Sequence, residues 1–305
     1  MKVFLSSTYK DLVPHRAAAA DAIERLEQQV VRMEVFGARS SEATVACLEK
    51  IDDAEAFVGL YAHQYGHVPN GSSISITEQE FVHARASGKQ MFCFLVDESY
   101  PWVPKHIEGE PGRTLLHKFK QRIQAELVRD TFSSPDDVAY KVSASLGRSL
   151  VTSRIEKRLA NLSDAASTAL GRSQIARRAA RIQPLVLGAH VLLVNDSPSG
   201  MNYVIDILQE VGLEIRVVRS TAEALKALST GRFDVVISDM ARDGIEDEGL
   251  RLLRKMRSNE MVTPVIFSVG RLDPERGTPP FAFGITSSAE DIFNLVFDAL
   301  ERQRG

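Results

Sequence analysis

Residues Ser72–Val96, SSISITEQEFVHARASGKQMFCFLV, join a helix-forming segment directly to a strand-forming one. The apolar run Met91–Val96 is typical of a strand that is covered on both faces of a sheet. An amphipathic helix and a short turn at residues 87–89 precede it, and Glu80 lies in the first turn of that helix. Ligands of open α/β sheets bind in the crevice beyond the strand ends. Glu80 is therefore the first candidate site residue.

Glu80 also has a purely structural interpretation. Thr77 and Glu80 have the spacing of a capping box, in which an N-cap hydroxyl and a glutamate three residues later satisfy each other's backbone N–H groups. Ser75 and Glu78 have the same spacing, so the start of the helix is ambiguous by two residues. Two alternatives stay open, a glutamate that caps the helix or faces solvent and a glutamate that serves a ligand site.

The composition bounds the class of protein. The chain has 305 residues, which is enough for two domains of common size. Its net charge of −3 and pI of about 6.2 give no support for binding to nucleic acid or membranes. The two cysteines, Cys47 and Cys93, are far apart, which indicates a reducing compartment without a disulfide framework. No apolar run approaches the ~18 residues of a membrane span and no signal peptide is visible, so we expect a cytoplasmic protein.

The N-terminal half alternates strand-forming and helix-forming segments. Strands are predicted over residues 3–6, 30–36, 56–61 and 91–96, with a short edge strand at 127–131. Helices are predicted over residues 12–28, 42–51, 77–86, 114–126 and 135–150. Strict alternation of this kind predicts a doubly wound parallel sheet.

Four motifs in order along this half resemble a TIR-like domain family of unknown function. They are VFLSSTYKDL, MEVFGA, FVGLYAHQYGHVP and SITEQEF, and the resemblance covers roughly residues 1–150. The family is often found at the N-terminus of larger signalling proteins, including NTPases with a NACHT module. In TIR domains that cleave NAD, the catalytic glutamate opens the helix before the fourth strand, and Glu80, followed by Gly88-Lys89, fits that pattern. The resemblance implies that Glu80 is catalytic and that NAD is the substrate.

Other candidate residues follow the first and third strands. Ser6, Ser7 and Tyr9 come after the first strand, where they either contact a ligand or form a turn. Tyr61 and His63 come after the third, where their rings either stack on a nicotinamide or adenine ring or cover the rim of the core. The histidines lack the spacing of a zinc site, and no G-x-G-x-x-G or G-K-[ST] loop is present.

The C-terminal half repeats the alternation. Strands are predicted over residues 190–194, 215–218, 235–238, 265–268 and 281–285, with helices over 201–210, 221–229, 249–257 and 289–303. The motifs VLLVNDS, FDVVISDM and TPVIFSVG occur in order, and residues 188–303 resemble a response-regulator receiver domain.

The receiver resemblance implies a phosphoacceptor site. Asp239 stands at the place of the phosphoacceptor, Asp196 and Asp239 at the place of the Mg²⁺ ligands, and Ser268 at the place of the hydroxyl that senses the phosphoryl group. Asn195 replaces what is often a second acid, and the family lysine is missing near residues 285–288. Receivers use Mg²⁺ and that lysine to neutralise the transferring group. A phosphorylatable switch and a degenerate receiver used for docking or dimerisation are both open.

The whole sequence predicts an α/β protein with two doubly wound parallel-sheet (flavodoxin-like) domains joined by a helical connector. The domains are residues 1–150 (TIR-like), 151–187 (connector) and 188–305 (receiver-like). The connector carries a small basic patch, Arg177, Arg178 and Arg181, which we interpret as a solvated helix face because the overall charge does not favour nucleic acid.

Two functions fit this organisation. In the first, the protein is a signalling enzyme, an NAD glycohydrolase controlled or assembled by the receiver. In the second, both domains are non-catalytic interaction modules. The implied partners are a histidine kinase or another signalling protein, and further copies of the chain in a homo-oligomer.

Overall fold

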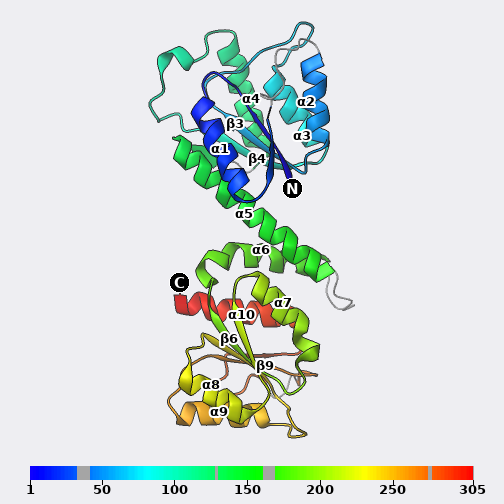
Figure 1. Cartoon of the computed structure of the whole chain (residues 1–305), viewed down its shortest axis with the longest axis vertical. Coiled ribbons are helices and arrows are strands. Elements are labelled where there is room, and N and C mark those ends of the chain that lie inside the picture. Colours follow the sequence, from blue (N-terminus) through cyan, green and yellow to red (C-terminus); the bar gives the residue numbers. More distant parts are fainter. Residues whose placement is uncertain (33–41, 128–129, 161–168, 274–276, 305) are drawn as a thin grey trace. The chain divides into compact units, whose positions relative to one another are not determined.

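Both halves of the chain are built around a five-stranded parallel sheet (Figure 1). The computed structural model describes residues 1–32, 42–127, 130–160, 169–273 and 277–304. The chain divides into two units, residues 1–147 and 148–305, which we call the N-terminal unit and the C-terminal unit. In these described segments, no helix has the length and apolar character needed to cross a membrane.

The sheet of the N-terminal unit has the strand order β2-β1-β3-β4-β5, with every neighbouring pair parallel. Its strands are β1 Lys2–Ser7, β2 Gln29–Val31, β3 Ala56–Tyr61, β4 Gln90–Val96 and β5 Asp130–Phe132. The strand order reverses between β1 and β3, and such a reversal opens a crevice at the carboxyl ends of the strands.

Helices cover both faces of this sheet. They are α1 Val13–Arg25, α2 Glu42–Asp52, α3 Ile76–Ala86, α4 Gly112–Glu126 and the first part of α5 Pro135–Ala160, with the short 3₁₀ helix η2 Pro104–His106 before α4. Side chains of α1 and α5 share one buried cluster with alternate residues of β1, β3 and β4. Side chains of α2, α3 and α4 share another with the remaining residues. This two-sided burial explains why β3 and β4 are continuous apolar runs.

The sheet of the C-terminal unit has the order β10-β9-β8-β6-β7, again all parallel. Its strands are β6 His190–Val194, β7 Glu214–Val218, β8 Val235–Asp239, β9 Val265–Ser268 and β10 Gly284–Thr286. Its helices are α6 Ala169–Val186, α7 Asn202–Glu210, α8 Thr221–Thr230, α9 Glu248–Ser258 and α10 Ala289–Arg304, with the 3₁₀ helix η3 Pro198–Met201 before α7.

The predicted fold class is confirmed, and the element boundaries differ in places. The second strand ends at Val31, and residues 33–41 of the predicted strand and loop lie outside the described residues. The last strand starts at Gly284 rather than at Phe281, because Phe281 has a positive φ of 66° and a side chain that faces solvent. Helix α5 does not stop near residue 150 but continues to Ala160, in a stretch without proline.

The helices predicted as a connector contribute to the core of the C-terminal unit. Ile155 of α5 and Ile175 of α6 belong to the same buried cluster as Phe297 of α10. Arg178 of α6 donates hydrogen bonds to Asp298 and Glu301 of α10, so part of the basic patch is neutralised.

Candidate functional site

Helix α3 starts at a serine cap that leaves Glu80 out of the capping box. Ser75 is the N-cap, and its hydroxyl accepts a hydrogen bond of 3.2 Å from the backbone N–H of Glu78. The Glu78 carboxylate accepts a hydrogen bond of 2.5 Å from the Tyr65 hydroxyl, which in turn accepts the N–H of Ser75 at 3.3 Å. The reciprocal half of the capping box is thus relayed through Tyr65. The Glu80 side chain has no part in the cap.

Glu80 is a buried carboxyl with a hydroxyl partner. The residue is 4% exposed, and the Ser6 hydroxyl at the end of β1 donates a hydrogen bond of 2.6 Å to its Oε2 atom. Burial raises the pKa of Glu80 to about 7, against the hydrogen bond from Ser6 and the positive charge of Arg16, which both lower it. A carboxyl that titrates near neutral pH can act as a general acid or base.

A hollow of about 410 Å³ opens beside Glu80 at the carboxyl end of β1. Its lining includes polar and aromatic side chains from the end of β1 and the loop after it, from α1, from the loop after β3 and from the start of α3: Ser7, Thr8, Tyr9, Arg16, His67 and Thr77. The Arg16 guanidinium lies 5.7 Å from the centroid of the exposed Tyr9 ring. Gly66 lets the loop approach, because its φ is +92° and an added Cβ would lie 3.2 Å from the Thr77 hydroxyl. We call this hollow the Glu80 pocket.

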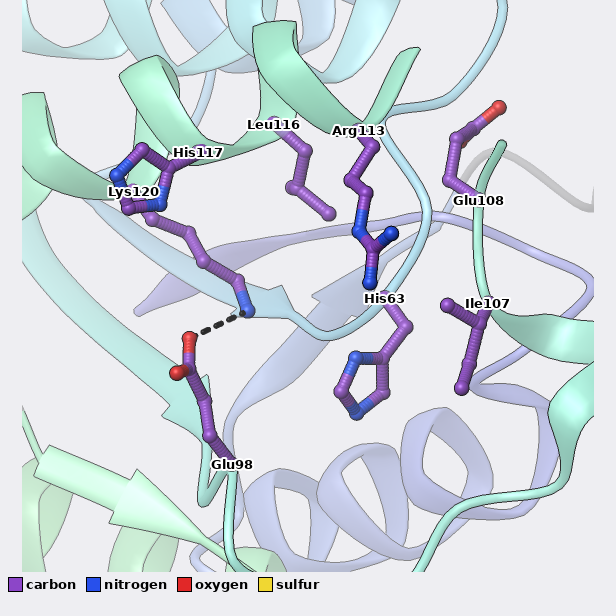
Figure 2. Close-up of a pocket in the computed structure, with 8 residues that line it drawn as sticks. All are labelled: His63, Glu98, Ile107, Glu108, Arg113, Leu116, His117 and Lys120. Atoms are coloured by element: carbon purple, nitrogen blue, oxygen red, sulfur yellow. Dashed lines mark ion pairs between the residues drawn. The ribbon is translucent and has the colours of Figure 1, made fainter. Parts of the chain in front are cut away.

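The structure brings most of the predicted cofactor-binding residues near Glu80 and places His63 elsewhere. Ser6, Ser7 and Tyr9 lie at or next to Glu80. Tyr61 is buried in the core against Phe119, with a ring-centroid distance of 5.1 Å. Burial raises the pKa of its hydroxyl, and Cys93 and Glu80 add to the rise while Ser6 lowers it, so this hydroxyl lies near Ser6 and Glu80 although the ring does not line the pocket. His63 lines a different hollow, together with residues of α4 (Figure 2).

Sequence reasoning did not single out Arg16. This residue of α1 is buried, and its guanidinium donates a hydrogen bond of 3.2 Å to the carbonyl of Ser7. A signal was present, because Arg16 stands three and four residues before Ala19 and Ala20, on the buried face of α1. A charged residue on the buried face of a helix indicates that its charged group has a hydrogen-bonding or ionic partner inside the protein.

In the C-terminal unit, the predicted acidic residues meet at the carboxyl ends of neighbouring strands. Asp239 ends β8 and is the register partner of Ser268 at the end of β9. Asn195, directly after β6, donates from Nδ2 to Asp239 Oδ2 at 3.4 Å. Burial raises the pKa of Asp239, and the negative charge of Asp196 adds to the rise.

This pair of carboxylates fits Mg²⁺. Two close carboxylates repel each other, and a divalent cation relieves that repulsion. Magnesium sites in proteins use one or two carboxylates and keep several waters. Asp196 and Asp239 would hold the ion, although one Asp196 oxygen already accepts a hydrogen bond of 2.8 Å from the N–H of Asp243. Within the described segments, no group of three or more His, Cys, Asp or Glu side chains has the arrangement of a metal cage.

Arg242 is a buried cation beside Asp239 that the sequence analysis missed. It is 1% exposed, and it donates to the Ser238 hydroxyl at 2.6 Å, to the Asp239 carbonyl and to the Thr221 hydroxyl at 3.1 Å. The Thr221 hydroxyl in turn donates a hydrogen bond of 2.7 Å to the Glu248 carboxylate. The signal in the sequence was a single basic residue in the otherwise acidic loop 241–248.

A tight turn holds Arg242 in this position. Arg242 and Ile245 exchange backbone hydrogen bonds of 3.1 and 2.8 Å around Asp243-Gly244. Both central residues have positive φ, 51° and 76°, as in a two-residue type I′ turn. Strand β10 ends in Thr286, whose hydroxyl accepts the backbone N–H of Ser288 at 2.9 Å, and residues 285–288, where the receiver resemblance leads us to expect a lysine, read Ile-Thr-Ser-Ser.

The C-terminal unit therefore has a five-stranded parallel sheet with two nearby carboxylates, Asp196 and Asp239, at the carboxyl ends of its strands. Residues 191–282 match the response regulator receiver domain family, and the chain carries such a domain in its C-terminal unit. Residues 2–147 match a domain of unknown function (DUF4062). That match adds no support to the TIR-like assignment or to NAD cleavage.

Comparison with individual proteins gives partial similarities. The transcriptional regulatory protein TrcR of Mycobacterium tuberculosis is 30% identical over 112 residues, which span 36% of this chain and 41% of that protein. The chemotaxis response regulator CheY4 of Vibrio cholerae is 24% identical, covers 37% of this chain and 98% of its own length, and has a TM-score of 0.32. The response regulator TrrA of Thermotoga maritima, solved in complex with Mg²⁺ and BeF, is also 24% identical, covers 36% of this chain and 98% of its own length, and has a TM-score of 0.32.

Proposed function

We propose that this chain is a signalling protein whose N-terminal unit is an effector that cleaves NAD at the Glu80 pocket. The observation that carries the proposal is Glu80 itself, which is buried, free of the helix cap and bonded to Ser6 at the edge of a 410 Å³ hollow. Burial of this charge disfavours folding at neutral and higher pH, so stability does not account for a carboxyl in that position. The TIR-like pattern Glu80-x₇-Gly88-Lys89 supplies the substrate class.

The lining of the pocket suits a dinucleotide. Arg16 offers a guanidinium for phosphate oxygens, and the exposed Tyr9 ring offers a face for a base or nicotinamide. The Glu80 carboxylate would stabilise the positive charge that develops on the ribose as the bond to nicotinamide breaks and its electron pair leaves with nicotinamide. Glu80 then takes a proton from the water that attacks the ribose.

Glutamine at position 80 should abolish this activity. Glu80→Gln keeps the shape and removes the charge and the base, so nicotinamide release from NAD should fall at least ~100-fold. The measurement is chromatographic quantification of nicotinamide, on the wild type and the variant at equal concentration and in the same state of association. Glu78→Gln is the matched control, because Glu78 lies on the same helix, is buried and bonds to Tyr65 instead. Equal rates for wild type and Glu80→Gln, or no release by any assembled wild-type form, would replace the enzyme with an interaction module.

We also propose that the chain is divided into functional parts as the sequence predicts, at residues 1–150, 151–187 and 188–305. For the receiver we propose a role in assembly rather than in phosphotransfer. Arg242 already supplies positive charge beside Asp239, and residues 285–288 lack the lysine that the receiver resemblance leads us to expect there. A transferring phosphoryl group would find Mg²⁺ at Asp196 and Asp239 but no lysine or arginine among residues 284–288, at the end of β10. The partner would be another copy of the chain or a signalling protein, a histidine kinase being the alternative partner if Asp239 is phosphorylated.

An acyl-phosphate mimic tests this role. When beryllium fluoride is added to the wild type in the presence of Mg²⁺, we expect the Tm and the association state to stay as they are with Mg²⁺ alone, because residues 284–288 offer the mimic no lysine. Differential scanning calorimetry and light scattering measure the two properties. A rise in Tm or a new oligomer that Asp239→Asn abolishes would favour the phosphorylatable switch.

A further inference from the structure

A second hollow lies in the N-terminal unit, between helix α4 and the loops that follow β3 and β4 (Figure 2). Its volume is about 320 Å³, and it shares no lining residue with the Glu80 pocket. Charged and imidazole side chains form most of its wall: His63, Glu98, Glu108, Arg113, His117 and Lys120. We call it the Lys120 pocket.

Lys120 is a buried cation with an exposed counterion. The residue is 7% exposed, and its Nζ atom lies 3.7 Å from Glu98 Oε1. The Glu98 side chain is 78% exposed, so solvent weakens this pair and the carboxylate can leave without cost to the core. Burial lowers the pKa of Lys120, with Glu98 and Asp11 opposing the shift. Glu98 is on the surface, and the two oxygens of the buried Asp11 already accept hydrogen bonds from the Thr8 hydroxyl and the His63 N–H, so the Lys120 ammonium is well placed to receive another anion.

His63 presents a ring nitrogen that lacks a partner. Its Nε2 atom is buried and forms no hydrogen bond within the described part of the chain. The backbone holds the residue in place, since its N–H donates to Asp11 at 3.3 Å and its carbonyl accepts the N–H of Glu108 at 2.9 Å. The ring also rests against Trp102, with centroids 5.2 Å apart. A buried polar atom that is fixed and unsatisfied calls for a bound water or ligand.

The remaining charges favour an anion in this space. Figure 2 shows the Arg113 guanidinium, the Lys120 ammonium and the His63 ring around one opening, with the Glu108 carboxylate directed away. Glu108 is occupied elsewhere, because its Oε2 atom accepts the N–H of Tyr65 at 2.6 Å. A guanidinium, an ammonium and an imidazole together match the oxygens of a phosphate group.

An adjoining hollow of about 360 Å³ indicates what the phosphate is attached to. It shares Glu98, His117 and Lys120 with the Lys120 pocket, and the polar side chains that it adds are one carboxylate, Asp97, and three uncharged groups, Gln121, Gln124 and Thr131. Amide and hydroxyl groups suit a ligand rich in hydroxyls. Both volumes lie near the lower end of the range for small-molecule sites.

We propose that the Lys120 pocket binds the phosphate monoester of a small polyhydroxylated molecule, with the phosphate between Lys120, Arg113 and His63 and the organic part over Gln121 and Gln124. The ligand displaces Glu98 from Lys120. This site is separate from the Glu80 pocket, so the proposal stands whether or not the N-terminal unit cleaves NAD.

Calorimetric titration of the full chain with ribose 5-phosphate tests the proposal, with inorganic phosphate and ribose as probes of the two halves of the ligand. Lys120→Met removes the buried charge and keeps the length of the side chain, and it should weaken the Kd at least tenfold. Arg113→Gln, at an exposed position that the fold does not need, should weaken it several-fold. Glu98→Gln should tighten it, because a competing carboxylate is lost. Lys118→Met, on the exposed side of α4, should leave it unchanged.

The result that overturns the proposal is equally direct. Absence of binding by the wild type at about 10 mM ribose 5-phosphate and phosphate would exclude a site of useful affinity. Equal affinity for ribose and ribose 5-phosphate, or equal affinities of Lys120→Met and Lys118→Met, would exclude phosphate recognition by Lys120. Binding that persists in the Glu80→Gln variant separates this site from the proposed NAD site.

Discussion

Replacing Glu80 with glutamine should raise the Tm of the N-terminal unit at pH 8 and change it little at pH 4.5. Burial lifts the pKa of this carboxyl from 4.5 in the unfolded chain to about 7 in the fold. Between these values the folded state binds more protons than the unfolded state, so stability falls as the pH rises through the window. Above pH 7 the free energy of unfolding is lower by about 3 kcal/mol, and the glutamine variant does not suffer this loss because its amide does not ionise. In a unit of this size that is roughly 6–12 °C in Tm.

The single tryptophan makes the measurement specific to one unit. Trp102 is the only tryptophan in the chain, and it lies in the N-terminal unit against His15 and His63. Thermal unfolding followed by its fluorescence at several pH values gives the difference between wild type and variant. Glu49→Gln, an exposed carboxylate of α2, should change stability by no more than about 0.5 kcal/mol. A Tm difference that is the same at pH 4.5 and pH 8 would contradict the raised pKa of Glu80.

Arg242→Met should destabilise the C-terminal unit and make it responsive to Mg²⁺. The substitution removes the hydrogen bonds to Ser238, the Asp239 carbonyl and Thr221, and it leaves the Asp196–Asp239 pair without its buried cation. Removing one partner of a buried charged network costs about 3 kcal/mol, or roughly 6–12 °C in Tm here. Mg²⁺ then replaces the lost charge, so it should stabilise the variant more than the wild type.

Calorimetry with and without Mg²⁺ measures both effects. Arg251→Met is the matched control, because Arg251 pairs with the same network at Glu248 but its side chain is 54% exposed. Its cost should stay below about 1 kcal/mol, with no gain in the response to Mg²⁺. Trp102 fluorescence reports on the other unit and should show the same transition in all three proteins. A fully stable Arg242→Met protein with no added response to Mg²⁺ would mean that Arg242 does not balance the acidic pair.

The fold could be predicted from local sequence patterns, because the periodicity of apolar residues along consecutive positions distinguishes buried strands from amphipathic helices. The positions of Ser6, Glu80, Asp239 and Ser268 could also be predicted, since parallel strands bring their carboxyl ends to one edge. The receiver assignment of the C-terminal half is confirmed by the family match.

Contacts of long side chains could not be read from the sequence in the same way. Arg16, Lys120 and Arg242 each reach from one element into the environment of another, and their partners lie on separate strands or loops. No local periodicity encodes such a reach, because it depends on the depth at which each helix or turn packs. Tyr61 and His63 show the same limit: Tyr61 ends β3 and His63 comes two residues later, yet the first side chain enters the core and the second lines a hollow.

Helix α5 has a consequence for how such a chain could be put together from modules. Val138, Val142 and Leu146 fill the core of the N-terminal unit, and Ile155 and Leu159 fill that of the C-terminal unit, on one uninterrupted helix. The segment that matches the receiver family begins only at residue 191. A fragment that started at residue 191 would lack the apolar residues of α5 and α6 that share a buried cluster with α10. Apolar side chains of α10 would then be exposed to solvent. In this chain the segment that could be transferred as an independent module is therefore longer than the family match, and it begins inside a helix rather than in a loop.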